Sequence, residues 1–307
     1  MTRHPYALYD AFSDAAFGGS QAAVVDRAQG IDRAQRIRIA RELGYPATGF
    51  IDGVQGDTVY AQFFSTVMEQ PMCGHGTVCL FSYLVDTGQI CPEAPEAMLS
   101  LRLPKTQASV RLSTGTGGRP AVMLQIAPPV FSRPQVDVGE LARHLGSDLD
   151  LFDPDLPLEV AKGDFTHLVV PARDLRAIGA IAPDFDGLTR FCRAHGIETV
   201  AVVTGQTVDQ KADLHVRDFC PAVGVAESAS AGTTNAALAC YAVRHQLVAT
   251  DKDRITVRAE QGIEIGRPSA IQSVVTLSKG EDTEVGEIWT GGVATKLVEG
   301  WIEIPET

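Results

Sequence analysis

The sequence lacks the features that would direct a protein to a membrane or to an oxidising compartment. Its 6 cysteines are dispersed and show no C-x-x-C spacing, which argues against a disulfide framework or a zinc site. The opening stretch MTRHPYALYDAF has no apolar run like that of a signal peptide, and no later stretch is long enough to span a bilayer. We therefore expect a cytoplasmic protein without membrane contact.

Positive charge and cofactor-binding motifs are scarce as well. The chain has 26 Lys and Arg residues against 38 Asp and Glu residues, a formal net charge of -12, so nucleic acid is not an expected partner. No Walker A motif or dinucleotide fingerprint is present, and no histidine pair has the spacing of metal ligands. A small anionic substrate is still compatible with this charge, because a few backbone N–H groups can create a local positive site.

Short apolar segments dominate what is present. The chain has 307 residues and is 45% hydrophobic, enough for one large domain or two of ordinary size. Many β-branched runs end at Gly, Pro, Asp or Ser, which predicts strands at 6–12, 22–25, 59–64, 99–103, 109–112, 122–126, 167–170, 200–203, 213–219, 255–258, 271–277 and 287–290. The spacing of apolar residues predicts surface helices at 32–43, 138–145 and 185–195.

Two further predicted helices, residues 74–85 and 232–243, are apolar or small on nearly every side. A helix without a polar face must be enclosed, so the many short strands indicate sheets wrapped around each of these helices. The two helices begin alike, because the string from Cys73 to Thr77 can be laid over the string from Ala231 to Asn235. This indicates two similar halves, joined by a linker near residues 127–134.

The start of the first enclosed helix carries the candidate chemistry. A helix start presents unpaired N–H groups and a partial positive charge. Cys73 directly precedes such a start, which predicts a lowered thiol pKa, and a protonated His75 would lower it further. A thiolate can remove an acidic C–H proton and return it, so Cys73 and His75 are the candidate catalytic residues. The alternative interpretation is that Cys73 is a small, buried apolar residue.

Backbone and hydroxyl groups at the two helix starts form the candidate substrate-binding set. Its members are Gly74, Gly76, Thr77, Ser228, Gly232, Thr233 and Thr234. Two helix starts that face one another would clamp a carboxylate and stabilise negative charge beside it. Thr233 and Thr234 can instead simply cap the second helix, and Ser228 can be an ordinary loop residue.

Motifs spread along the chain carry a family resemblance. They are Asp10-Ala11-Phe12 with Phe17-Gly18-Gly19; Ile39 to Leu43 with Thr48 and Phe50; Phe64-Ser65-Thr66 with Glu69 and Cys73-Gly74-His75; Arg217-Asp218-Phe219 with Pro221, Gly224, Glu227 and Gly232-Thr233; Gln261 to Ser269; and Gly291 to Ala294 with Gly300. With these motifs the chain resembles the PhzF-like proteins of the diaminopimelate-epimerase and proline-racemase superfamily. The string from Gln261 to Ser269 is the most specific of them.

The resemblance implies an α+β fold of the diaminopimelate-epimerase type, with two pseudo-symmetric halves that are each a β-barrel around a central helix. The expected halves are residues 1–126 and 127–295, and the last strand, at about 296–307, is expected to return to the first half. The resemblance also implies an active site in the cleft between the halves, a small carboxylate substrate, no cofactor and a homodimer. The implied reactions are epimerisation, racemisation or double-bond isomerisation by proton transfer.

Three departures from the family limit what this resemblance carries over. The family's catalytic Glu falls at Ala47, its Asp in the second-half loop falls at Ser228, and the second cysteine of the two-base epimerases falls at Ala231. Alanine cannot transfer a proton, so Cys73 is left as a single acid/base. One base can still remove a proton at one carbon and return it at another, which favours double-bond isomerisation over two-base racemisation.

The leading hypothesis is therefore a cofactor-independent isomerase that moves a double bond by a 1,3- or longer proton shift on a small cyclic or amino-acid-derived carboxylate. Similar isomerases with altered catalytic residues act in the pathway to the 4-alkyl-proline units of certain antibiotics, and this implies a substituted pyrroline-2-carboxylate as substrate. Two alternatives stay open. One is an amino-acid epimerase or racemase in which His75, water or a substrate group assists Cys73, and the other is a catalytically silent binding protein on the same scaffold.

Overall fold

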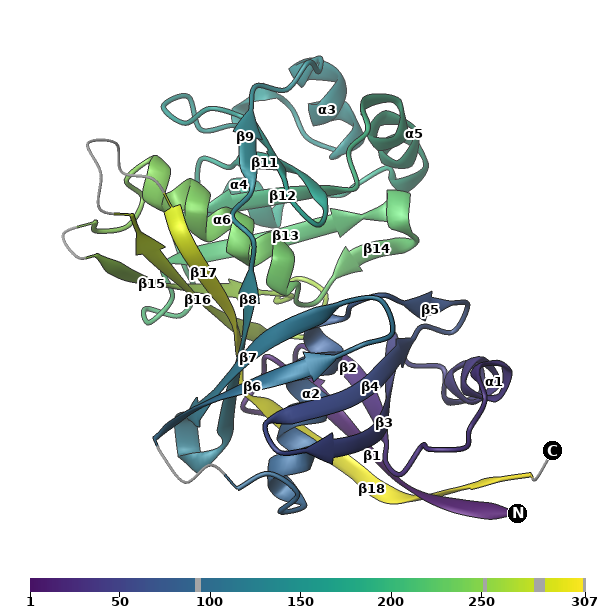
Figure 1. The fold of residues 1–307 in the computed structure, drawn as a ribbon. Helices are drawn as coiled ribbons and strands as arrows, with labels where there is room; N and C mark the ends of the chain where they lie inside the picture. The colour runs from purple at the N-terminus through teal and green to yellow at the C-terminus, as the bar shows by residue number, and fades with distance from the viewer. Residues whose placement is uncertain (92–94, 251–252, 279–284, 306–307) are drawn as a thin grey trace. The chain divides into compact units, whose positions relative to one another are not determined.

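The computed structural model describes residues 1–91, 95–250, 253–278 and 285–305, and it divides the chain into two compact units (Figure 1). Unit 1 consists of Met1–Gln125 and Gly291–Thr307, and unit 2 consists of Ile126–Thr290. Each unit combines a curved sheet with helices, so the predicted α+β fold is confirmed. In the described part of the chain, no helix has both the length and the apolar character needed to cross a membrane.

The elements follow one another in a mixed order of strands and helices. From the N-terminus they are β1 (Thr2–Ala11), β2 (Ser20–Val25), α1 (Arg33–Leu43), β3 (Ala47–Gln55), β4 (Thr58–Phe64), β5 (Glu69–Gln70), α2 (Gly74–Asp86), β6 (Glu96–Arg102), β7 (Gln107–Thr114), the 3-10 helix η1 (Thr116–Gly118) and β8 (Pro120–Ile126). They continue as β9 (Val130–Ser132), α3 (Val138–His144), η2 (Leu149–Leu151), β10 (Glu159–Lys162), β11 (Thr166–Pro171), α4 (Leu175–Gly179), α5 (Phe185–His195), β12 (Thr199–Thr204), β13 (Leu214–Cys220), η3 (Pro221–Val223), β14 (Val225–Ser228), α6 (Gly232–Arg244), β15 (Arg254–Gln261), β16 (Ser269–Leu277), β17 (Val285–Gly292) and β18 (Ala294–Ile304).

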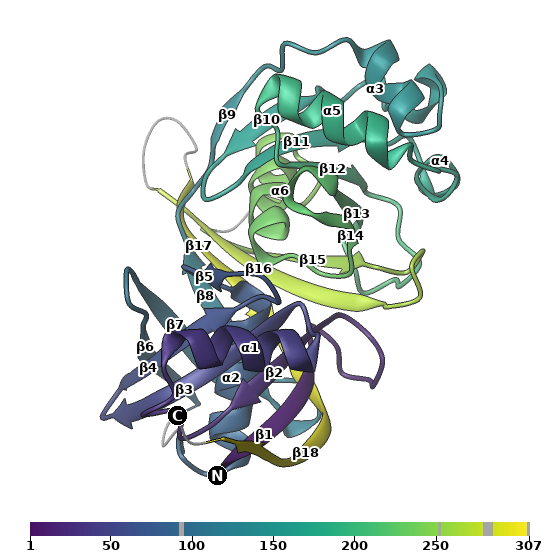
Figure 2. The same cartoon turned by 90° about the vertical axis from the view of Figure 1, so that its right-hand side faces the viewer.

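In unit 1 the strands form one continuous ladder. β18 pairs with β1, β1 with β2, β2 in parallel with β3, and β3 with β4. β4 then pairs in parallel with β6, β6 with β7, and β7 with β8, while the short β5 extends the end of β4. The antiparallel pairing of β18 with β1 brings the last strand of the chain beside the first one (Figures 1 and 2).

In unit 2 the ladder repeats the same order with different residues. β9 pairs with β10, β10 with β11, β11 in parallel with β12, and β12 with β13. β13 then pairs in parallel with β15, β15 pairs with β16, and the short β14 extends the end of β13. The stretch expected to be a linker, 127–134, contains β9 and therefore contributes to this sheet.

The long helices occupy two kinds of place. α2 and α6 are each enclosed by the strands of their own unit (Figures 1 and 2), and every residue of α6 from Thr234 to Val243 is buried. Such enclosure is possible because small and apolar residues cover all sides of both helices. α1 lies outside the sheet of unit 1, and α3, α4 and α5 lie outside the sheet of unit 2, where their apolar faces pack on its second side.

Candidate active site

The Cys73 region lies at one end of the unit 1 barrel, and strand pairing determines which residues gather there. Ala22 pairs with Ala47 at the start of β3, and Thr48 pairs with Phe64 at the end of β4. Phe64 in turn pairs with Glu69, from which the chain reaches Cys73. The start of α2 is therefore at the same end of the barrel as Ala47, the residue to which the resemblance assigns the position of the catalytic Glu.

Cys73 is the N-cap residue of α2, with extended backbone angles of φ -147 and ψ 106. Its sulfur lies 3.6 Å from Nδ1 and 3.8 Å from Nε2 of His75, and it accepts a hydrogen bond from the backbone N–H of Gly76. The predicted pairing of Cys73 with His75 is therefore present in the structure. Cys73 is buried, with 6% of its surface exposed.

The protonation state of this pair differs from the prediction. Burial raises the pKa of the Cys73 thiol to about 12, and the hydrogen bond from Gly76 opposes this only in part. Burial also lowers the pKa of His75 to about 4. The expectation of a resting thiolate supported by a protonated His75 is wrong, because the low polarity of the enclosed site outweighs the helix start. At neutral pH the pair is a thiol beside a neutral imidazole.

Of the other predicted groups of unit 1, one borders open space and two hold the backbone or the sulfur of Cys73 in place. A Cβ atom on Gly74 would meet no atom within 4 Å, so this residue borders open space. A Cβ on Gly76 would lie 2.9 Å from the Phe63 ring and 3.0 Å from the Cys73 sulfur, so Gly76 is required for the position of the thiol. The Thr77 hydroxyl is buried and donates to the Cys73 carbonyl at 2.8 Å, which makes it a brace of the helix start rather than an open binding group.

The start of α6 has the same backbone form with different side chains. Its N-cap residue is Ala231, with φ -138 and ψ 111, and no side chain caps the helix. The interpretation of Thr233 and Thr234 as caps is therefore wrong. Thr234 donates to the Asp218 carboxylate at 2.9 Å, Thr233 borders a small cavity, and Gly232 is partly buried. The Ser228 hydroxyl donates to the Ser230 carbonyl at 3.2 Å, as an ordinary loop residue does.

The loop that leads into α6 is held by the most specific string of the sequence. The Gln261 side chain donates to the Ser228 carbonyl at 2.7 Å, and the Ser269 hydroxyl donates to the Ala229 carbonyl at 2.9 Å. Gly262 has a φ of 79, and a Cβ there would lie 2.6 Å from the Ala229 carbonyl oxygen. Only glycine permits this approach, so the string fixes the backbone at the start of α6.

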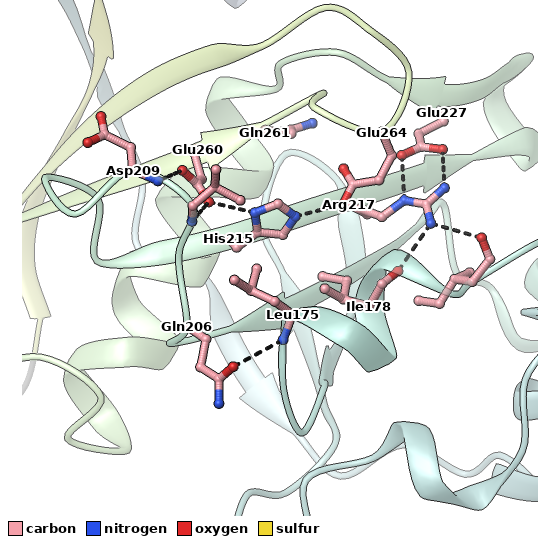
Figure 3. Close-up of polar contacts among 12 residues, drawn as sticks. Leu175, Ile178, Gln206, Asp209, His215, Arg217, Glu227, Glu260, Gln261 and Glu264 are labelled. Carbon is pink, nitrogen blue, oxygen red and sulfur yellow. Dashed lines mark hydrogen bonds and ion pairs between the residues drawn. The ribbon is translucent and has the colours of Figure 1, made fainter.

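Buried ion pairs support the same region (Figure 3). His215 contacts Glu260 at 2.6 Å and Glu264 at 2.8 Å, one carboxylate at each ring nitrogen. Arg217 binds Glu227 through two hydrogen bonds of 2.8 Å and also donates to the carbonyls of the segment around α4. These groups satisfy one another, which is typical of structural support rather than of catalysis.

A polar cluster near the start of α6 was missed from the sequence. Nδ1 of His167 lies 2.7 Å from the Thr199 hydroxyl and 3.5 Å from the Thr234 hydroxyl, and the Thr234 hydroxyl bonds to Asp218. All four residues are buried. The available signal was the presence of His167 and Asp218 inside otherwise apolar strands. Elsewhere too, the described residues include no set of three or more His, Cys, Asp and Glu side chains placed to hold a metal ion.

Comparison with known proteins agrees with this architecture. The family described as phenazine biosynthesis-like protein matches residues 9–300. The Escherichia coli K12 protein named uncharacterized isomerase YddE is 27% identical over 295 residues, which cover 94% of each chain. The trans-2,3-dihydro-3-hydroxyanthranilate isomerase of Pseudomonas chlororaphis is 27% identical over 271 residues, 87% of this chain and 88% of that one. The crystal structure of a PhzF-family phenazine biosynthesis protein from Bacillus anthracis covers 99% of this chain and 100% of its own, with a TM-score of 0.88 and 22% identity.

The fold and the two helix starts thus define the class of protein, an isomerase or epimerase built from two related barrels. The chain belongs to the phenazine biosynthesis-like family, called PhzC-PhzF. It is an isomerase of this family.

Proposed function

We propose that this isomerase moves a double bond along a small carboxylate with a conjugated C=C–N system, and that Cys73, at the start of α2, donates and accepts the proton that moves. The observation that carries the proposal is the position of the Cys73 sulfur, which accepts the Gly76 N–H and lies 3.6 Å from His75. At the same end of the unit 1 barrel, the methyl group of Ala47 offers no competing acid or base.

The neutral thiol determines the order of the proton transfers. Because the resting sulfur holds a proton, the first step is donation: the S–H bond breaks, a C–H bond forms at the end of the enamine system, and an iminium cation and a thiolate arise together. The thiolate then takes a proton from another carbon, which restores the S–H bond and leaves the double bond in a new position. The paired charges suit a buried site, and the Gly76 N–H stabilises the transient thiolate.

The substrate class follows from the groups at the helix start. Helix geometry leaves the N–H groups of Gly74 and His75 without intrahelical acceptors, and the open space beside Gly74 gives a carboxylate access to them. An acid-first mechanism requires an electron-rich double bond, which a ring nitrogen supplies. A substituted pyrroline-2-carboxylate meets both requirements, and the name of the Pseudomonas chlororaphis relative denotes another ring that bears nitrogen and a carboxylate.

The test uses a 4-alkyl-substituted pyrroline-2-carboxylate in heavy water. We expect the wild type to incorporate deuterium and to change the ultraviolet absorbance of the ligand, because the conjugation moves. Cys73→Ala should lose at least 100-fold in rate, which is within the usual range for an acid/base residue. Cys79→Ala is the matched control, because Cys79 is also a buried cysteine of α2.

Two results would refute the proposal in different ways. Deuterium incorporation with inversion of a stereocentre and no change in absorbance would identify an epimerase instead. Equal exchange rates for the wild type and Cys73→Ala would remove the sulfur from the mechanism. Thermal melts of all three proteins show whether a loss of rate reflects loss of the fold.

A further inference from the structure

The polar cluster of unit 2 occupies positions whose counterparts in unit 1 are apolar. The strand orders of the two units match, so the pair His167 and Thr199 corresponds to the pair Ala22 and Ala47. By the same pairing, Asp218, which lies opposite Ser228, corresponds to Phe63, which lies opposite Gln70. Unit 2 thus carries titratable groups at the barrel end that is equivalent to the Cys73 end of unit 1.

The contacts connect a buried carboxyl to a buried imidazole through two hydroxyls. Asp218 is completely buried, and its Oδ2 accepts the Thr234 hydroxyl at 2.9 Å. Its Oδ1 has no partner with full hydrogen-bond geometry among the residues that the structure describes. On the other side, the hydroxyls of Thr199 and Thr234 lie 2.7 Å and 3.5 Å from Nδ1 of His167. A carboxyl with an open buried oxygen is a group that can accept a proton.

The remaining nitrogen of His167 is directed away from this network. Within the described residues Nε2 has no hydrogen-bond partner, and the His167 side chain borders a cavity of about 10 Å³ that Thr233 and Asp164 also line. The cavity has room for about one water molecule, and Thr233 and Asp164 are its other polar lining residues.

The donor directions fix the tautomer of His167. While Asp218 is ionised, it accepts hydrogen bonds from the hydroxyls of both Thr234 and Thr199. Both threonine protons are then committed to the carboxylate, so the two threonine oxygens near Nδ1 can only accept from Nδ1–H. His167 then carries its proton on Nδ1, and Nε2 is a free base. When Asp218 is protonated, its O–H can donate to Thr234, Thr234 can donate to Nδ1, and the imidazole must carry its proton on Nε2.

We propose that His167 is a second proton-transfer residue of this enzyme, and that Asp218 supplies and stores its proton through Thr234 and Thr199. A proton that arrives at Nε2 forms a new N–H bond there. The Nδ1 proton passes to a threonine oxygen, the former threonine proton passes to the carboxylate, and one proton has been taken up in total. The role of this relay in catalysis rests on the proposed function, whereas the relay itself does not.

The pKa of Asp218 lies close enough to neutral pH for this carboxyl to take up and release a proton. Burial raises the pKa of this carboxyl to about 6, although the hydrogen bond from Thr234 lowers it. The other titratable groups near the relay are Cys220 of β13, Glu227 of β14 and Asp164 at the cavity. Glu227 is already paired with Arg217, so its charge is largely compensated.

The test is nitrogen NMR of the histidine side chains in the full-length protein, because the two neutral tautomers have distinct ¹⁵N shifts. In the wild type we expect His167 to change from Nδ1–H to Nε2–H as the pH falls, with a midpoint near 6. Asp218→Asn should abolish the change, since the amide cannot take up the proton. His195 is the control, because its ring bonds to the Phe191 carbonyl, away from the relay.

Several outcomes would overturn the relay. It is refuted if wild-type His167 keeps one tautomer at every pH, or if Asp218→Asn changes tautomer at the same midpoint. Should Asp218→Asn fail to fold, the double variant Thr199→Val, Thr234→Val serves instead, and a persistent change in it is equally contradictory.

The catalytic role is tested by deuterium exchange into the pyrroline ligand. His167→Gln should slow this exchange at least tenfold. Unchanged exchange with an intact tautomer change would refute the catalytic role alone. If His167 changes tautomer but Cys73→Ala leaves the deuterium exchange into the ligand unchanged, the proposed function is refuted and the relay is not.

Discussion

At the scale of single residues, Gly76 determines where the Cys73 sulfur can lie. A methyl group at Gly76 would crowd the sulfur at 3.0 Å and the Phe63 ring at 2.9 Å. We predict that Gly76→Ala destabilises the protein by about 1–3 kcal/mol, as overpacking does, and moves the thiol away from His75. Calorimetry measures the loss of stability, and the rate of deuterium exchange into the pyrroline ligand measures the effect of the moved thiol.

Gly74→Ala is the matched control, because both glycines belong to the first turn of α2. No atom lies within 4 Å of a Cβ at Gly74, so the melting temperature should be unchanged or slightly raised by the better helix propensity of alanine. Equal destabilisation by the two substitutions would show that Gly76 serves only backbone flexibility and not the position of the sulfur.

At the scale of elements, the turn after β15 holds the loop that starts α6. Gly262 and Gly224 both have positive φ, at 79 and 92, but only Gly262 closely approaches another backbone segment. Gly224→Ala should cost roughly 1–2 kcal/mol for the left-handed conformation alone. Gly262→Ala should cost about 1–3 kcal/mol more and speed amide exchange in residues 228–234.

Hydrogen exchange followed by mass spectrometry compares these two variants directly. Faster exchange confined to residues 228–234 in Gly262→Ala alone is the expected pattern, because only this variant pushes on Ala229. If both variants exchange alike in this loop, the close approach at Gly262 contributes nothing to the start of α6.

The elements that the sequence predicts best are those with a strong local pattern. The sequence predicts enclosed helices at 74–85 and 232–243, and α2 and α6 occupy Gly74–Asp86 and Gly232–Arg244. β3 was not among the strands predicted from the pattern, because its residues ATGFIDGVQ include two glycines and no regular alternation. Its pairing with β2 and β4 stabilises it through contacts that are distant in the sequence.

The candidate site shows the same limit in its electrostatics. The contact of Cys73 with His75 was predictable, because a cap residue and the second residue of a helix are close neighbours. The direction of the thiol pKa was not, since it depends on how completely other strands exclude water from the sulfur. The cluster of His167, Thr199 and Asp218 likewise joins residues from three strands, which no local pattern brings together.

At the scale of the whole molecule, two units with one strand order have acquired different interiors. Around the start of α2, Phe63 lies close to Gly76 and the Cys73 thiol lies beside His75, whereas the cluster near the start of α6 holds a carboxyl, an imidazole and two hydroxyls. A duplicated scaffold permits this, because each barrel keeps its own core while the residues at one end change. The polar groups at the end of a barrel can therefore differ between the two units without loss of the fold.

The buried histidines of unit 2 also give global stability two opposite dependences on pH. Burial lowers the pKa of His167 to about 4, so between pH 6.5 and 4 the unfolded chain binds a proton that the folded chain does not. As the pH decreases from 6.5 to 4, the contribution of His167 therefore lowers the free energy of unfolding by about 1.4 kcal/mol per pH unit. For His215, burial lowers the pKa, but the hydrogen bonds to Glu264 and Glu260 outweigh burial and raise it. Its contribution is complete below about pH 6.5 and is lost as the pH rises through the raised value.

Urea unfolding of His167→Gln and His215→Gln at several pH values tests these signs. His167→Gln should gain stability relative to the wild type as the pH falls from 6.5 to 4. His215→Gln should lose about 3–5 kcal/mol near pH 6, because it breaks a buried ion pair, and the loss should shrink in alkaline solution. The loss of stability should also shrink in strong acid. Burial raises the pKa of Glu264, but the hydrogen bond to His215 outweighs burial and lowers this pKa overall. The Glu264 carboxylate therefore keeps its charge, and its contribution to stability, until the pH is below the usual range of a glutamate pKa. Parallel pH profiles for the two variants would contradict this account, because both histidines would then titrate alike in the folded protein.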